Sequence, residues 1–205
     1  KELGYVSDLD VIFLFDDEDD MAPSNYAKLA QRFITWMTAH TPAGILFDID
    51  TALRPDGASG MLVSSLAAFE RYQKQSAWVW EHQALTRARF CAGDAAIGAR
   101  FEAIRDSVLR QDRSDREAEL KEEVRKMRRR MHEAYPNRTM LFDLKQDAGG
   151  MIDIEFIVQY LVLRHAAAYP QLTANLGNIA LLRIAGELGL IDATLAADVG
   201  GAYRT

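Results

Sequence analysis

The hydrophobic pattern at the start of the chain alternates between strand-like and helix-like segments. Residues 9–15 and 44–50 are rich in aliphatic and aromatic side chains and lack helical periodicity, which is typical of strands. Between them, apolar side chains recur every three or four positions over residues 24–39. This spacing predicts a helix that turns one face to the core, with Ser24 as its N-cap.

Helical patterns dominate the rest of the chain. Residues 61–63 fit a short third strand or the start of a helix, and residues 140–145 form one more extended run. Further helices are predicted at residues 64–75 (capped by Ser64 or Ser65), 78–90, 97–110, 114–134 (capped by Ser114), 152–168, 175–188 and from 193 onward. This order indicates an α+β fold, with a small mixed sheet and flanking helices over residues 1–105 and a helical bundle region over residues 106–205.

The composition is that of an ordinary globular protein. The 205 residues, 49% of them hydrophobic and 26% charged, can build one large domain or two small ones with a sizeable core. A net charge of −6 argues against a broad electrostatic surface for nucleic acid. Cys91 is the single cysteine, which excludes an internal disulfide and fits a reducing compartment, and the four histidines lack the spacing of a zinc site.

The chain carries no targeting or membrane signal in its sequence. No run approaches the roughly 18 consecutive apolar residues of a membrane span. The chain opens on Lys1 without a signal peptide, and it begins without methionine. We therefore expect a cytoplasmic protein, no contact with membranes, and a sequence that is a fragment of something longer.

Two pairs of carboxylates mark the predicted strands. Asp8 and Asp10 stand at the start of the first strand, and Asp48 and Asp50 close the second. Residues two apart in a strand point to the same face, so each pair projects side by side. Adjacent carboxylates repel unless a cation neutralises them, and Mg²⁺ prefers carboxylate oxygens completed by phosphate oxygens. The first pair alone also fits a polar strand entry, with Ser7 and Asp8 in a turn.

The second acidic strand favours a catalytic site at these carboxylates over a merely polar strand entry. Two strands that bring carboxylates to one edge of a sheet assemble three or four acids there. Such a cluster suits metal-assisted phosphoryl or nucleotidyl transfer, in which metal ions hold the attacking and leaving oxygens.

Charged side chains on the predicted helices allow two interpretations each. Arg87 and Arg89 follow aromatic residues on one helix and could hold phosphate oxygens, or they could pair with local acids. The basic cluster at residues 125–130 could bind a polyanion, although glutamates one turn earlier favour a solvated face. Asp153 and Glu155 could complement a helix dipole or join the acidic site.

Several segments resemble the bacterial glutamine synthetase adenylyltransferase family, which belongs to the nucleotidyltransferase superfamily related to DNA polymerase β. The similar segments are Glu-Leu-Gly-Tyr-Val-Ser-Asp-Leu-Asp (2–10), Ala-Gly-Ile-Leu-Phe-Asp-Ile-Asp (43–50), Leu-Arg-Pro (53–55), Trp-Glu-His-Gln-Ala-Leu-Thr-Arg-Ala-Arg (80–89) and Gly-Gly-Met-Ile-Asp-Ile-Glu-Phe (149–156). Their combination is far more specific than the Asp-x-Asp pair alone.

The resemblance implies a reaction and a direction. Enzymes of this family carry two such domains, one adding AMP to a tyrosine of glutamine synthetase and the other removing it by phosphorolysis. Residues 77–85 look more like the adding, C-terminal domain. The deadenylylating half and a non-catalytic module that binds nucleotide or a regulator remain alternatives. The family also implies glutamine synthetase, the PII signalling protein and glutamine as partners.

The resemblance further implies residue roles. Asp8 and Asp10 would bind the Mg²⁺ (or Mn²⁺) of metal–ATP, and Asp50 would be the third carboxylate, with Asp48 as a variable neighbour. The implied phosphate contacts are Ser7, Arg54, Arg87 and Arg89. Residues 141–155 could return to the active site. The chain departs from the family pattern in two ways: it starts after the family's phosphate-binding Gly-Gly turn, and Ala52 replaces a usual arginine.

Overall fold

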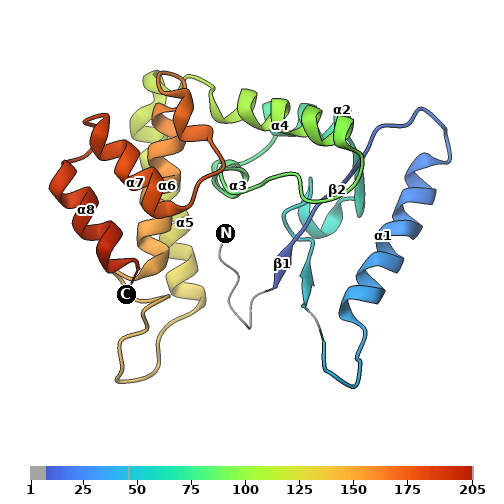
Figure 1. Cartoon of the computed structure of the whole chain (residues 1–205), viewed down its shortest axis with the longest axis horizontal. Helices are drawn as coiled ribbons and strands as arrows, with labels where there is room; N and C mark the ends of the chain where they lie inside the picture. The colour runs from blue at the N-terminus through green and yellow to red at the C-terminus, as the bar shows by residue number, and fades with distance from the viewer. Residues whose placement is uncertain (1–7, 46, 205) are drawn as a thin grey trace. The chain divides into compact units, whose positions relative to one another are not determined.

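The computed structural model describes residues 8–45 and 47–204 (Figure 1). The chain divides into two compact units. Residues 1–77 and 90–104 form the first unit, and residues 78–89 and 105–205 form the second. Each unit has a hydrophobic cluster of its own, so each is described by itself.

The described residues of the first unit contain four short strands in two parallel pairs. They are β1 (Leu9–Asp10) with β3 (Ile49–Asp50), and β2 (Phe13–Phe15) with β4 (Val63–Ser65). The segment predicted as one strand over residues 9–15 is therefore divided into two strands, which pair with different partners. Both pairs are parallel, whereas a mixed sheet was predicted. Of the run at residues 61–63, only Val63 belongs to a strand, as the first residue of β4, and the run does not start a helix.

Helices α1 (Ala22–Thr38) and α2 (Leu66–Gln75) flank these strands in the sequence. The predicted cap of α1 is wrong, because Pro23 lies in the first turn of a helix that already begins at Ala22. The predicted cap of α2 is confirmed: the Ser65 hydroxyl accepts a hydrogen bond from the Ala68 amide at 3.2 Å.

The core of the first unit lies between β2, β4 and α1. Its buried members are Phe15, Ala22, Ala30 and Val63. Tyr26 of α1 stacks on Phe15 with ring centroids 5.1 Å apart. Burial of this strand pair against α1 explains why the apolar run after Asp10 is extended. It also leaves the shorter β1–β3 pair, with its carboxylates, outside this cluster.

The second unit is helical. Its elements are α3 (Val79–Leu85), the end of α4 (Ala95–Leu109), α5 (Glu117–Ala134), α6 (Met151–His165), α7 (Asn178–Glu187) and α8 (Ala193–Ala202). Short 3₁₀ turns cover Gly57–Ser59 in the first unit and Ser114–Arg116 and Pro170–Thr173 in the second. The core is formed mainly by α6 and α7, around Val158, Val162, Leu181 and Leu182.

Three predicted elements of this region differ from the structure. The helix expected over 78–90 ends at Leu85, because the guanidinium of Arg105 takes the carbonyl oxygens of Leu85 (2.9 Å) and Thr86 (2.8 Å) that a longer helix would use. Ser114 is not a cap, since it starts a 3₁₀ turn before α5. The run at 140–145 is a loop of local hydrogen bonds instead of a strand.

Strands that precede a long helical region agree with the α+β class. That prediction is confirmed. Across residues 8–45 and 47–204, no helix combines the length and the apolar character needed to cross a membrane.

Candidate active site

The candidate active site lies on the β1–β3 pair of the first unit. Asp10 and Asp50 are register partners in this parallel ladder. Two backbone hydrogen bonds of 2.8 Å fix the register, from the Leu9 amide to the Asp48 carbonyl and from the Val11 amide to the Asp50 carbonyl. Adjacent strands lie about 4.8 Å apart, and register partners project to the same side. The two carboxylates are therefore neighbours.

Asp8 adds a third negative charge to this pair. The pKa of Asp10 is raised above its ordinary value, first by the protein atoms that remove part of its hydration and then by the charges of Asp8 and Asp50. Asp10 nevertheless remains open to solvent. The structure thus places Asp8 and Asp50 within electrostatic reach of Asp10. Asp48 is exposed on the same strand segment, and Ser7 lies outside the described residues.

The donor set fits a divalent cation that substrate helps to bind. Within residues 8–45 and 47–204, no group of three or more His, Cys, Asp or Glu side chains could hold a metal ion by itself. Mg²⁺ commonly takes one or two protein carboxylates and completes its shell with water and substrate phosphates. Asp10 and Asp50 supply such a pair. The pKa of Asp10 is raised first by burial and then by the charges of Asp8 and Asp50, and a bound cation would offset that negative charge.

A loop after β3 supports Asp50. Its Oδ1 accepts a hydrogen bond from the Ala52 amide at 2.7 Å. The Arg54 guanidinium then donates to three carbonyl oxygens of the same loop, those of Thr51 (2.8 Å), Ala58 (3.3 Å) and Gly60 (3.3 Å). Arg54 therefore holds the loop together. A phosphate contact would require its guanidinium to give up one of these bonds.

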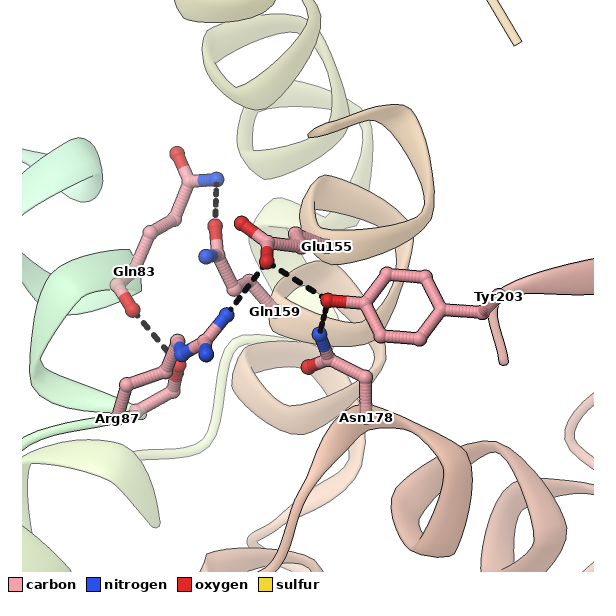
Figure 2. A network of polar contacts seen from close by, with 7 residues as sticks. Gln83, Arg87, Glu155, Gln159, Asn178 and Tyr203 are labelled. Atoms are coloured by element: carbon pink, nitrogen blue, oxygen red, sulfur yellow. Dashed lines mark hydrogen bonds and ion pairs between the residues drawn. The ribbon is translucent and has the colours of Figure 1, made fainter. Parts of the chain in front are cut away.

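Arg87 lies in the second unit, in a network of polar side chains (Figure 2). Its Nη1 is 2.8 Å from Oε1 of Glu155 on α6. The Tyr203 hydroxyl donates to the same Oε1 at 2.9 Å and accepts from the Asn178 amide at 2.8 Å. Gln83 is bonded to Gln159 beside it, at 2.8 Å. Arg87 is thus paired with an acid, one of the two interpretations that the sequence allowed for it. For Glu155, pairing with Arg87 is neither of the two roles considered from the sequence.

Burial and the Glu155 carboxylate both act on Tyr203. They raise the pKa of its hydroxyl, burial more than the hydrogen bond and the charge. Asp153, the other acid at the start of α6, forms an ion pair with Arg128 of α5 and accepts from the Gly149 amide at 2.5 Å. Arg89 is exposed and forms no ion pair with a residue that the structure describes.

Sequence reasoning missed the residues that organise the second unit. Arg105 is 3% exposed and donates to three backbone carbonyls, of Leu85, Thr86 and Thr173. Helical spacing places Arg105 on the same face as Phe101, Val108 and Leu109, which are buried. This position was the available signal, although an arginine is normally expected on a solvated face. Tyr203 is separated from Glu155 by 48 positions, and only the fold brings them together.

Comparison with known proteins places these features in a family. A family model described as "Glutamate-ammonia ligase adenylyltransferase" matches residues 1–104. Over the whole chain, the sequence is 63% identical to a protein of Ralstonia nicotianae, 61% to one of Aromatoleum aromaticum and 58% to one of Chromobacterium violaceum. Each of these is named "Bifunctional glutamine synthetase adenylyltransferase/adenylyl-removing enzyme". The chain spans 22% of the length of each.

Proposed function

This chain belongs to the glutamate-ammonia ligase adenylyltransferase family, and we propose that it catalyses metal-dependent transfer of AMP from ATP to a tyrosine hydroxyl of glutamine synthetase. Such a modification would regulate nitrogen assimilation in the cytoplasm. The observation that supports the proposal most is the register of β1 and β3, which sets Asp10 beside Asp50 with Asp8 close enough to affect Asp10.

The chemistry demands an activated hydroxyl and a stabilised leaving group. A tyrosine hydroxyl has an ordinary pKa near 10, so it needs a base or a cation to attack at neutral pH. In the proposed reaction the phenolic oxygen attacks the α-phosphorus of ATP, the bond from that phosphorus to the bridging oxygen breaks, and pyrophosphate leaves. Bound Mg²⁺ or Mn²⁺ would supply charge stabilisation for the phosphate oxygens.

The chain's own residues have three tasks in this scheme. Asp8 and Asp10 would hold the metal ion that accompanies the triphosphate of ATP. Asp50, oriented by its bond to the Ala52 amide, shares the second metal position or accepts the phenolic proton. Ser7, Arg54, Arg87 and Arg89 are the proposed phosphate contacts.

Label transfer tests the proposal. Purified protein is incubated with glutamine synthetase, Mg²⁺ and ATP labelled in its α-phosphate, and labelled glutamine synthetase is measured with time. We expect labelling by the unmodified protein and loss of at least about 100-fold with Asp10→Asn or Asp50→Asn, because each removes a charge that acts only with the bound triphosphate. Asp48→Asn, at an exposed residue directly before β3, is the control and keeps its activity. Full labelling by the Asp10→Asn, Asp50→Asn double variant would reject the assignment.

The relatives' names favour one second candidate, the adenylyl-removing direction. In that reaction phosphate would attack the tyrosyl adenylate and release ADP. Adenylylated glutamine synthetase plus phosphate, compared with unmodified glutamine synthetase plus ATP, separates the two directions. Metal-dependent ATP binding without either product would instead identify a binding module. PII and glutamine remain the proposed regulators, and neither nucleic acid nor a membrane has a part in this scheme.

A further inference from the structure

An apolar groove with a basic rim lies between α5 and α6 in the second unit. The two helices pack against each other, and the groove has a volume of about 460 Å³. Its floor is formed by Val124 of α5 and by Phe156, Ile157 and Tyr160 of α6. Ile157 is 50% exposed, so an aliphatic side chain of the groove is open to solvent.

Positive side chains line one rim at helical spacing. Lys121, Arg125 and Arg129 follow one another every four residues along α5, so they form a ridge about 12 Å long on one face. Lys121 and Arg125 form no hydrogen bond or salt bridge with any residue in the described part of the chain. Arg129 is paired only with Glu122, and both side chains are more than half exposed. Such exposed pairs contribute little and exchange readily.

Arg128 also lines the groove. Its Nε pairs with Asp153, and its Nη2 donates to the Gln146 carbonyl at 2.8 Å. Its Nη1 is buried and has no hydrogen-bond partner among the described residues. The guanidinium therefore adds positive charge to the lining of the groove, and a carboxylate is the ligand group that matches such a charge best.

We propose that this α5–α6 groove binds an acidic amphipathic helix of a partner protein. The apolar floor would take aliphatic side chains of that helix, and the Lys121–Arg125–Arg129 ridge would face carboxylates repeated every four residues. This is the helix-in-groove mode of recognition, in which the helical spacing of the partner's side chains matches the helical spacing of the groove's residues. The local positive charge opposes the chain's net charge of −6, so the charge is a property of this surface rather than of the whole protein.

The floor decides between this occupant and a bare polyanion. A phosphate polymer would neutralise the ridge but leave Ile157 and Phe156 in water. A helix with one apolar and one acidic face covers both features at once, and burial of its aliphatic side chains adds to the charge attraction.

Fluorescence anisotropy with a designed peptide tests the proposal. The probe is a labelled helical peptide with Leu at positions i, i+3, i+4 and i+7 and Glu at the flanking positions. We expect saturable binding to the protein, weaker by about tenfold or more for Arg125→Glu with Arg129→Glu, and similarly weaker for Ile157→Asp. The matched controls are Arg130→Glu on α5, which does not line the groove, and Leu195→Asp on α8, where Leu195 is 55% exposed. Both controls should bind as the unmodified protein does.

Two further ligands make the result decisive. A peptide of the same composition in shuffled order keeps the charge and loses the segregated faces, so we expect it to bind about tenfold more weakly. Inorganic polyphosphate carries the charge without apolar groups. The proposal would be overturned if the shuffled peptide bound as tightly as the designed peptide, or if the designed peptide did not bind. It would also be overturned if polyphosphate bound through Arg125 and Arg129 while the designed peptide did not bind.

Discussion

Asp10 and Asp50 are direct register partners across the parallel β1–β3 pair. Two ionised carboxylates in this relation repel each other, so their interaction destabilises the folded state. A cation bound between them would remove this repulsion. The neighbouring loop bonds of Arg54 and the Ala52 amide hold Asp50 in this position. The relationship leads to two predictions, one without metal and one with it.

Without metal, Asp10→Asn should make the protein more stable at neutral pH. The pKa of Asp10 in the folded state is raised above its ordinary value of 3.8, so the folded chain binds this proton more tightly than the unfolded chain does. The stability that protonation provides is fully present below pH 3.8 and is lost as pH rises through the folded-state pKa. We expect Asp10→Asn to raise the free energy of unfolding by on the order of 0.5 kcal/mol at pH 7, because solvent screens the exposed group.

Urea denaturation at pH 7 and at pH 3 measures this effect. The gain should vanish at the lower pH, where Asp10 is protonated in both states, and Asp48→Asn should produce no comparable gain at either pH. A loss of stability in Asp10→Asn at pH 7 would show that another interaction of Asp10 outweighs the repulsion.

With metal, stabilisation should depend on nucleotide. Because two carboxylates leave most of the Mg²⁺ shell to water and phosphate, Mg²⁺ and a non-hydrolysable ATP analogue should together raise the melting temperature by more than the sum of their separate effects. Ligand at ten times its dissociation constant stabilises by about 1.4 kcal/mol. We expect this joint shift to disappear in Asp50→Asn and to remain in Asp48→Asn. A joint shift that survives in Asp50→Asn would place the metal elsewhere.

The carboxylate pairs could be predicted because their cause is local. Side chains two apart on a strand share a face, and both Asp-x-Asp segments follow that rule from sequence alone. The division of residues 9–15 between two partners could not be predicted. It depends on β2 and β4 packing together with α1, in a cluster whose members are up to 48 positions apart, as with Phe15 and Val63.

The helical elements were predicted well in their interiors and poorly at their ends. Periodicity locates the buried stripe of α5, but a helix end depends on which group takes the last carbonyls. At α3 that group is Arg105, from a helix 20 positions away. The loop at 140–145 has an apolar sequence typical of a strand, yet the side chains of Asn137 and Asp147 bond its backbone into turns.

Arg105 should be among the residues most important for the stability of the second unit. Its side chain is buried and donates to the carbonyls of Leu85, Thr86 and Thr173. Arg105→Met keeps most of the volume but removes the guanidinium donor from all three carbonyls, and the Leu85 carbonyl retains only the Ala88 amide at 3.2 Å. We expect a loss of roughly 3–5 kcal/mol in the free energy of unfolding, measured by urea denaturation. Arg110→Met, on the same helix segment and exposed, should cost less than about 1 kcal/mol. Equal losses would contradict the role of the carbonyl contacts.

Tyr203 should stabilise the end of the chain through its hydroxyl. The hydroxyl bonds both Glu155 and Asn178, which lie on α6 and α7 (Figure 2). Tyr203→Phe retains the ring and removes both bonds, so we expect a loss of about 1–2 kcal/mol by thermal denaturation. Tyr135→Phe, at a residue 65% exposed, should change stability by less than about 0.5 kcal/mol.

Because Glu155 also holds Arg87, Tyr203→Phe should speed hydrogen exchange of the amides near Arg87. Unchanged exchange there would mean that Arg87 and Glu155 hold each other without Tyr203.

Gly60 should be intolerant of any side chain, for a reason that is purely steric. Its φ of −81° is open to every residue, but a Cβ built at this position collides with the carbonyl oxygen of Pro55. Pro55 and Gly60 both belong to the loop that Arg54 holds together by donating to the Gly60 carbonyl. Gly60→Ala must therefore shift the loop, at a cost of about 1–3 kcal/mol. Since the loop begins at the Asp50 side chain, the shift should also lower the proposed AMP transfer.

Gly201→Ala is the matched control: it lies in α8 with no atom within 4 Å of its Cβ position. There, alanine should stabilise the helix by up to about 1 kcal/mol. Comparing the unfolding midpoints and labelling rates of the two variants distinguishes a collision from a general effect of replacing glycine, and a stable, fully active Gly60→Ala protein would contradict the loop geometry.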